Sequence, residues 1–171
     1  MRKQKTKKTP ERKILFLSLL FICIVGIYAL GCYPTYTGMK IKVMHQLYSE
    51  LQQMELADLD DDDMETLNEF QKEKFEVMVV NEAFEQIYTT RTVVSQDYIN
   101  KHIANKTEYF NEKATIERRK MESRQVLFLR GKIIQGEHIY YVYIKKDVQS
   151  GLDIIEGTIW YFVVCLALVT L

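Results

Sequence analysis

ILFLSLLFICIVGIYALGCY, residues 14–33, is the stretch around which the rest of this 171-residue chain is arranged. None of its twenty residues carries a formal charge. An α-helix of that length spans about 30 Å, the thickness of the hydrocarbon core of a bilayer. The stretch exceeds the roughly 7–15 apolar residues of a cleaved signal peptide and ends in tyrosines that suit a membrane–water interface. We therefore predict an uncleaved transmembrane helix over 14–33.

Charge is divided sharply around this stretch. Residues 1–13 hold seven Lys and Arg against the single acid Glu11, whereas 34–156 holds sixteen basic and twenty-two acidic residues. The excess of cations on one side predicts a cytoplasmic N-terminus and an extracytoplasmic location for the segment that follows. Because the basic run abuts an apolar stretch and not a folded domain, it favours membrane topology over nucleic-acid binding.

The three cysteines, Cys23, Cys32 and Cys165, all lie in or beside apolar stretches. The middle of the chain therefore has no disulfide framework and no zinc-ligand spacing. Extracellular domains of this size often carry disulfides, so their absence favours a bacterial cell-surface domain.

The segment after the first apolar stretch has helical periodicity. Apolar residues recur at Ile41, Met44, Tyr48 and Leu51, which predicts an amphipathic helix from residue 39 to about 56. Residues 34–38, PTYTG, either break the helix or are part of a kinked continuation. The apolar face of this helix has two possible uses, packing on a sheet or pairing with a second copy of the chain.

An acidic run at 58–63 precedes the apolar residues of a further helix. Aspartates at a helix N-terminus accept hydrogen bonds from its free N–H groups and suit its dipole, so we interpret the run as a cap. The rival hypothesis is a divalent-cation site, because four carboxylates occupy positions 1, 3, 5 and 12 of an EF-hand-like loop: Asp58, Asp60, Asp62 and Glu69. The sixth position is Asp63 where such loops have glycine, which favours the cap.

The remaining middle segment alternates between strand and turn patterns. Residues 75–80 and 84–90 predict a hairpin, Ser95 predicts the cap of a helix over 95–110, and 118–134 predicts one strand. After a turn at 135–137, residues 138–146 (HIYYVYIKK) form the strongest strand pattern. Both faces of that strand are apolar or aromatic, so it should be central and covered on both sides. The prediction is an α+β fold, with a long N-terminal helix packed on an antiparallel sheet.

The chain closes on a second apolar stretch over 154–171, with Trp160 and Tyr161 where interfacial aromatic residues are expected. We predict a second membrane helix here, truncated before any cytoplasmic charges, and hence a longer parent protein. The predicted protein is a multi-pass protein of the plasma membrane.

Three segments, LADLDDDDMETLNEF (56–70), FEVMVVNEAFEQIYTT (75–90) and YYVYIKKDVQSGLDIIEGTIWYF (140–162), carry a resemblance. Together with the layout of the chain, they resemble the N-terminal sensor region of bacterial membrane-bound sensor histidine kinases. The resemblance implies a PAS-like or single-Cache domain over 34–153 between two membrane helices, a homodimer, and an extracellular small-molecule or ion signal. A cytoplasmic response regulator would be reached only through a kinase part beyond residue 171.

Two alternatives remain open. One is the sensor region of a chemotaxis or cyclic-dinucleotide receptor, and the other is a two-span membrane interaction protein without enzymatic output. The chain has no Gly-rich phosphate loop, H-E-x-x-H or G-x-S-x-G motif, so we predict no catalytic residues and no cofactor within it.

A ligand site, if present, is expected on the sheet face opposite the amphipathic helix. Its candidate residues are aromatic or cationic: Tyr88, Arg91, Tyr98, Arg124, Tyr141 and Tyr143. The alternative is ordinary sheet packing for the tyrosines and a solvated surface for the arginines. His102 is isolated from other ligand types, and we expect it to take part in packing or to contact solvent.

Overall fold

A computed structural model describes residues 9–92, 94–121 and 124–148, together with 154, 158–161, 163, 164 and 167. The chain divides into two compact units, Gly38–Gln149 and Met1–Thr37 with Ser150–Leu171. Its elements follow the order α1 (Thr9–Leu51), α2 (Asp61–Lys72), β1 (Glu76–Val80), β2 (Gln86–Thr89), α3 (Gln96–His102), the 3₁₀ helix η1 (Ala104–Tyr109), β3 (Thr115–Met121), β4 (Arg124–Gln135) and β5 (His138–Val148). The predicted α+β class is confirmed.

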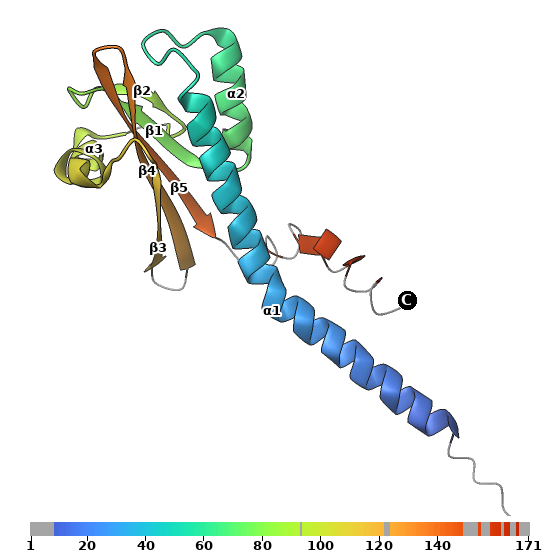
Figure 1. Cartoon of the computed structure of the whole chain (residues 1–171). Coiled ribbons are helices and arrows are strands. Elements are labelled where there is room, and N and C mark those ends of the chain that lie inside the picture. Colours follow the sequence, from blue (N-terminus) through green and yellow to red (C-terminus); the bar gives the residue numbers. More distant parts are fainter. Residues whose placement is uncertain are drawn as a thin grey trace, which may run out of the picture. The chain divides into compact units, whose positions relative to one another are not determined.

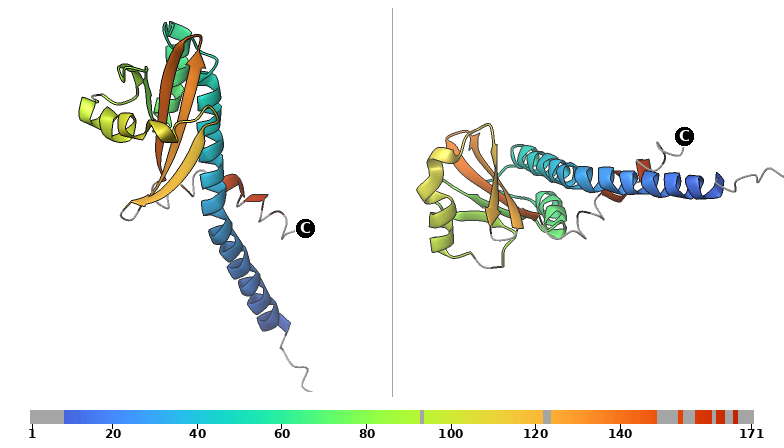
Figure 2. Two further views of the ribbon diagram at one scale, coloured as in Figure 1. Left: turned by 60° about the vertical axis from the view of Figure 1, so that its left-hand side comes forward. Right: turned by 90° about the horizontal axis from the view of Figure 1, so that it is seen from below.

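The core of the larger unit is one five-stranded sheet in the order β2-β1-β5-β4-β3 (Figure 1). Every pair of neighbouring strands in it is antiparallel. β5 lies in the middle, as its apolar faces predicted, and Tyr143, Val142 and Ile144 are fully buried. α1 and α2 cover one face and α3 covers the other, so both faces of the central strand are shielded from water (Figure 2).

The C-terminal half of α1 is fixed on the sheet through Tyr48. The Tyr48 hydroxyl lies 2.9 Å from the carbonyl oxygen of Lys132 and 3.0 Å from that of Glu112. Burial, and after it the Glu112 carboxylate, raises the pKa of Tyr48 to about 12, so the hydroxyl remains a donor. The ring packs over Gly131 of β4 so closely that a β-carbon there would overlap it. Glycine is thus required for α1 to approach the sheet.

The opposite face carries an apolar core under α3. It combines alternate residues of the strands with the inner side of the helix: Met78, Val80, Ile99, Ile103, Phe110, Val126, Phe128 and Tyr143. The alternation follows from the pleat of each strand, since successive side chains point to opposite faces.

Local signals in the sequence are confirmed at several turns and caps. Asp60 caps α2 in a reciprocal capping box with Asp63, and Ser95 caps α3. The β1–β2 hairpin forms as predicted. Gly136 has φ +62° at the first position of the two-residue β4–β5 turn, a position that favours glycine.

Two predicted boundaries are wrong. The segment predicted as one strand over 118–134 is a hairpin of β3 and β4, paired from Met121↔Arg124 to Thr115↔Arg130. β3 is an edge strand, where exposed charges are tolerated and protect against aggregation, so its polar sequence did not look like a strand of its own. The predicted helix over 95–110 is also divided, because Ile103 and Lys106 leave helical φ/ψ values and a 3₁₀ segment follows.

The first helix is continuous across Pro34 and ends at Leu51. The open choice between a break and a continuation at 34–38 is thereby settled, and the predicted extension to residue 56 is wrong. After Leu51 the chain turns, and the Gln135 side chain bonds the backbone of Met54 and Leu56. These bonds satisfy polar groups just past the helix end.

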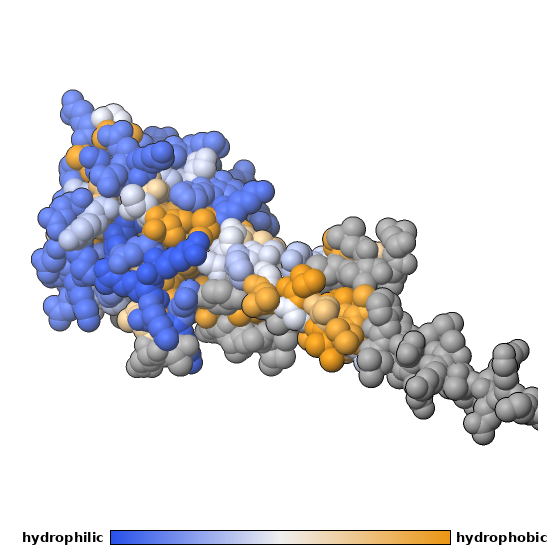
Figure 3. All heavy atoms as spheres, turned by 60° about the horizontal axis from the view of Figure 1, so that its bottom comes forward, coloured by the Kyte–Doolittle hydropathy of each residue, from blue (hydrophilic) through white to orange (hydrophobic). Residues whose placement is uncertain are grey.

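One candidate membrane span is present in the described part of the chain. Ser18–Leu51 of α1 is the one helix there that is long and apolar enough to cross a membrane. Large apolar side chains along it are exposed, including Leu30 at 82% (Figure 3). The predicted second membrane helix over 154–171 lies mostly outside the described residues. Those that are described, 154, 158–161, 163, 164 and 167, are helical.

Candidate functional site

The strongest concentration of polar contacts surrounds Glu76, the first residue of β1. Glu76 pairs with Lys145 of β5, and strand alternation places it on the same face as Met78. Its side chain is only 17% exposed. A carboxylate in this position requires donors to replace the water it loses on folding.

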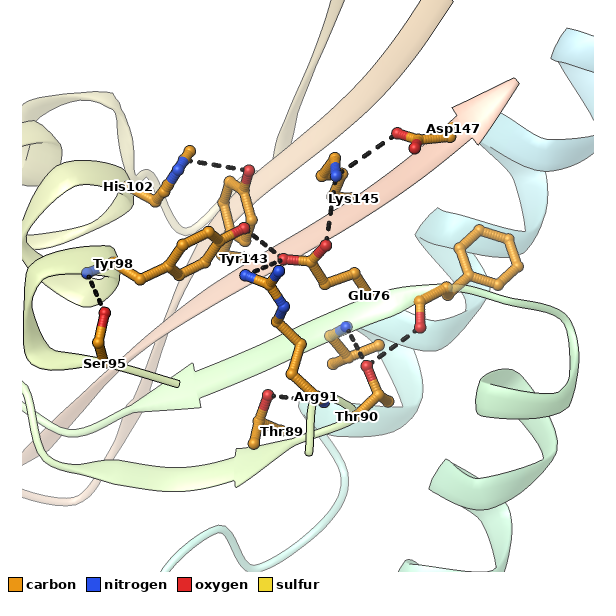
Figure 4. A network of polar contacts seen from close by, with 12 residues as sticks. Glu76, Thr89, Thr90, Arg91, Ser95, Tyr98, His102, Tyr143, Lys145 and Asp147 are labelled. Atoms are coloured by element: carbon orange, nitrogen blue, oxygen red, sulfur yellow. Dashed lines mark hydrogen bonds and ion pairs between the residues drawn. The ribbon is translucent and has the colours of Figure 1, made fainter. Parts of the chain in front are cut away.

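Three donors from three different segments provide that replacement (Figure 4). The Tyr98 hydroxyl of α3 donates a hydrogen bond to Glu76 Oε1. Arg91 Nη1, after β2, lies 3.5 Å from the same oxygen, and Lys145 Nζ lies 3.3 Å from Oε2. Lys145 also lies 3.5 Å from Oδ1 of Asp147. Glu76 therefore links α3, β5 and the segment that follows β2.

Aromatic rings form a layer beside this carboxylate. The Tyr98 and His102 rings lie 4.2 Å apart, and the His102 and Tyr143 rings 5.4 Å apart, measured between centroids. The Tyr143 hydroxyl lies 3.3 Å from His102 Nδ1. The Arg91 guanidinium is centred 4.3 Å from the centroid of the Tyr98 ring, within cation–π range. We call Glu76, Arg91, Tyr98, His102, Tyr143 and Lys145 the Glu76 cluster.

Burial controls protonation in this cluster. It raises the pKa values of Tyr98 and Tyr143, and the Glu76 carboxylate raises both further. Burial, followed by the charges of Lys106 and Lys101, lowers the pKa of His102 to about 4. Near neutral pH the tyrosines remain protonated hydroxyls and His102 remains neutral. Tyr98, His102 and Tyr143 therefore supply hydrogen bonds and aromatic surface without carrying a charge of their own.

The cluster unites three of the predicted ligand-site residues, Arg91, Tyr98 and Tyr143. Tyr141 lies on the same face but packs against Phe84 and Phe110, with centroid distances of 5.7 and 5.6 Å.

The other two predicted residues lie elsewhere. Tyr88 pairs with Val79, which points to the α1 face, so it is buried on the opposite side of the sheet. Arg124 begins β4 and is exposed, six residues before Arg130, which pairs with Tyr143.

No family model matches the chain, and neither a curated protein nor a solved structure matches it.

The sequence alone did not single out Glu76 and Lys145. Each is a charged residue in a strand, and their relation depends on the register in which β1 pairs with β5. The only local signal is a charge that interrupts apolar stretches. His102 is in aromatic contact, in agreement with the packing expected for it.

A second buried charge lies on the same face, at Arg130 of β4. Arg130 is 5% exposed, and its Nη1 lies 2.7 Å from Glu117 Oε2. Arg119 pairs with the same carboxylate, and these two bonds lower the pKa of Glu117. Burial, and then Arg130, lowers the pKa of Lys106. This part of the face is cationic.

The carboxylates of the cation hypothesis do not converge with other ligands. In the described residues, no three His, Cys, Asp or Glu side chains are placed to hold a metal ion together. Asp60 instead accepts a hydrogen bond from the backbone N–H of Asp63 at 2.8 Å, and Asp62 lies in the first turn of α2. Asp58 precedes the cap, while Glu69 lies two turns into α2. This geometry is that of a capped helix.

Proposed function

We propose that this chain is the sensor region of a bacterial transmembrane sensor histidine kinase. In this proposal the Gly38–Gln149 unit is an extracytoplasmic domain of PAS-like or single-Cache type. The two apolar stretches that flank it are membrane helices, and the kinase part belongs to the parent protein beyond residue 171. A five-stranded antiparallel sheet with a long helix on one face supports the proposal.

The observation that carries the proposal is contact between the two apolar stretches inside their own unit. The Tyr28 hydroxyl lies 2.9 Å from Thr158 Oγ1, and the Tyr28 and Tyr161 rings stack with centroids 6.3 Å apart. A β-carbon at Gly31 would fall 2.7 Å from the Tyr161 hydroxyl. Small residues allow membrane helices to approach closely in this manner. The contacts support a pair of adjacent membrane helices.

The first stretch is part of α1, which continues into the sheet domain, and the second follows β5 in the sequence after residues 149–153. α1 extends to Tyr48 at the sheet, and β5 carries Tyr143 and Lys145 before it ends at Val148. A ligand that binds two arrangements of the Glu76 cluster unequally would shift the population of those arrangements. Because β5 lies in the cluster and leads to the second stretch, such a shift can move one helix relative to the other.

The chemistry of the cluster favours a small polar ligand. Arg91, whose side chain is 40% exposed, can offer its guanidinium to a carboxylate or phosphate group in competition with Glu76, and the partly exposed Tyr98 ring beside it offers an aromatic surface. A homodimer would allow the shift to reach a paired cytoplasmic kinase part.

The test uses the complete reading frame that contains this chain, expressed in membrane vesicles with labelled ATP. The proposal expects phosphate to be incorporated on a histidine. It also expects Glu76→Gln to change the level of incorporation, while Glu108→Gln, an exposed site outside the cluster, leaves it unchanged. A reading frame without a phosphoacceptor histidine helix and an ATP-binding domain would contradict the kinase assignment.

A further inference from the structure

The sheet domain has two chemically different ends. At the first, which we call the entry end, α1 enters: Lys40 pairs with Glu73 at 2.7 Å and lies over the Phe75 ring. β5 leaves at the same end, where Val148 pairs with Gln125. The β3–β4 hairpin closes beside it, from Met121 to Arg124 (Figure 1).

The opposite end, which we call the far end, holds the connections between elements. The Gln135 side chain bonds the backbone of Leu56 there, and His138 lies 4.0 Å from Glu82 across two turns. The described residues of the entry end are 38–42, 72–76, 118–121, 124 and 145–148, and those of the far end are 55–63, 81–85 and 136–138.

Charge separates between these ends. These entry-end residues include ten Lys and Arg against three Asp and Glu, while the far-end segments contain nine Asp and Glu and no Lys or Arg. The larger unit is thus electrically polarised even though the whole chain has a formal net charge of zero. A polarised domain orients in an external field, such as that of a charged surface.

The β3–β4 hairpin is the most exposed cationic part of the entry end. Arg118, Lys120 and Arg124 are exposed, and in the described part of the chain no ion pair involves them. Met121 lies among them with 52% of its surface exposed. An apolar side chain flanked by cations suits the boundary between lipid headgroups and acyl chains.

Connectivity brings this end close to a bilayer. Val148 and Ile154 are six residues apart, so the chain between them reaches about 20 Å at most. If the second apolar stretch begins at the membrane surface, that reach limits how far the entry end can lie from the headgroups. Electrostatic attraction to an anionic surface acts over about 10 Å at moderate salt.

We propose that the β3–β4 hairpin binds the phosphate headgroups of anionic phospholipids in the leaflet that faces the sheet domain. A lipid surface is the partner that fits, because the exposed cations and Met121 lie at the end of the domain where α1 enters and β5 leaves. The same surface repels the acidic far end, so attraction at one end and repulsion at the other both turn the entry end towards the bilayer. This inference depends on the membrane anchorage in the proposed function.

The experiment is hydrogen exchange of the full chain in nanodiscs, with phosphatidylcholine alone or with added phosphatidylglycerol. We expect amides of 116–121 and 124–128 to exchange about tenfold more slowly in the anionic discs, and this protection to disappear at high salt. Arg118→Gln/Arg124→Gln should abolish the protection. The matched variant Lys101→Gln/Lys113→Gln removes two exposed lysines that lie outside both defined ends and should retain it.

Equal exchange in both kinds of disc, with the chain incorporated, would overturn the lipid proposal and leave the anchorage intact. Protection retained by the Arg118/Arg124 variant would also overturn it. Failure of the chain to incorporate into discs of either composition would contradict the anchorage itself, and with it the surface contact.

Discussion

Replacing Glu76 with glutamine tests whether the Glu76 cluster holds α3 and the segment after β2 on the sheet. Glutamine keeps the shape of the side chain but removes the charge that Lys145 and Arg91 approach at 3.3 and 3.5 Å. Each of these partly exposed ion pairs contributes about 0.5 kcal/mol to stability. The hydrogen bond from Tyr98 to the charged carboxylate contributes about 1.5 kcal/mol more than the same bond to the neutral amide of glutamine, which would also stand beside two cations. The expected loss is about 2.5 kcal/mol of unfolding free energy.

The assay is urea unfolding of the full chain in detergent micelles, followed by near-ultraviolet circular dichroism of the tyrosines. A loss of about 2.5 kcal/mol lowers the urea midpoint by about 1 M for a domain of this size. Glu108→Gln, which makes the same chemical change at an exposed position of η1, serves as the control and should leave the midpoint unchanged. A midpoint for Glu76→Gln within about 0.2 M of the wild type would refute the assigned role.

Three further predictions use the same unfolding assay. Gly131→Ala should destabilise the fold by about 2 kcal/mol, because the new β-carbon overlaps the Tyr48 ring. Gly38→Ala, in helix α1 with open space around it, should stabilise the fold slightly. Equal effects of the two substitutions would refute the close approach of Tyr48 to Gly131. The pKa of His102 in the folded chain, about 4, lies below its ordinary value, so on acidification the unfolded chain binds the proton first. The free energy of unfolding should therefore fall by about 1 kcal/mol between neutral pH and about pH 5, a figure already reduced for solvent screening. His102→Gln should reduce that slope, and an unchanged slope would contradict it. Asp60→Ala should cost about 1 kcal/mol by removing the α2 cap, and Asp58→Ala should cost little.

Sequence reasoning succeeded where one segment contained its own evidence. β5 was expected to be central because both of its faces are apolar, and the position of Ser95 before an apolar period was enough to place the cap of α3. The pairing of Asp60 with Asp63 likewise depends on residues three apart. Such local features require no knowledge of the rest of the fold.

Features that depend on distant partners could not be predicted. Glu76 meets Tyr98 across 22 residues and Lys145 across 69, so the cluster exists only once the register of β1 and β5 is known. Tyr88 was assigned to the wrong face because a strand's pattern shows which residues share a face but not which helix covers it. β3 was missed because an edge strand needs little apolar surface.

The most direct test of the whole account is the side of the membrane on which the sheet domain lies. In a variant without Cys23, Cys32 and Cys165, a single cysteine is introduced by Glu137→Cys in the β4–β5 turn or by Lys7→Cys in the basic leader. Intact cells are then treated with a membrane-impermeant maleimide. We predict labelling at position 137 in intact cells, and labelling at position 7 only after the cells are opened. Labelling of intact cells at position 7, with none at 137, would contradict an extracytoplasmic sensor domain.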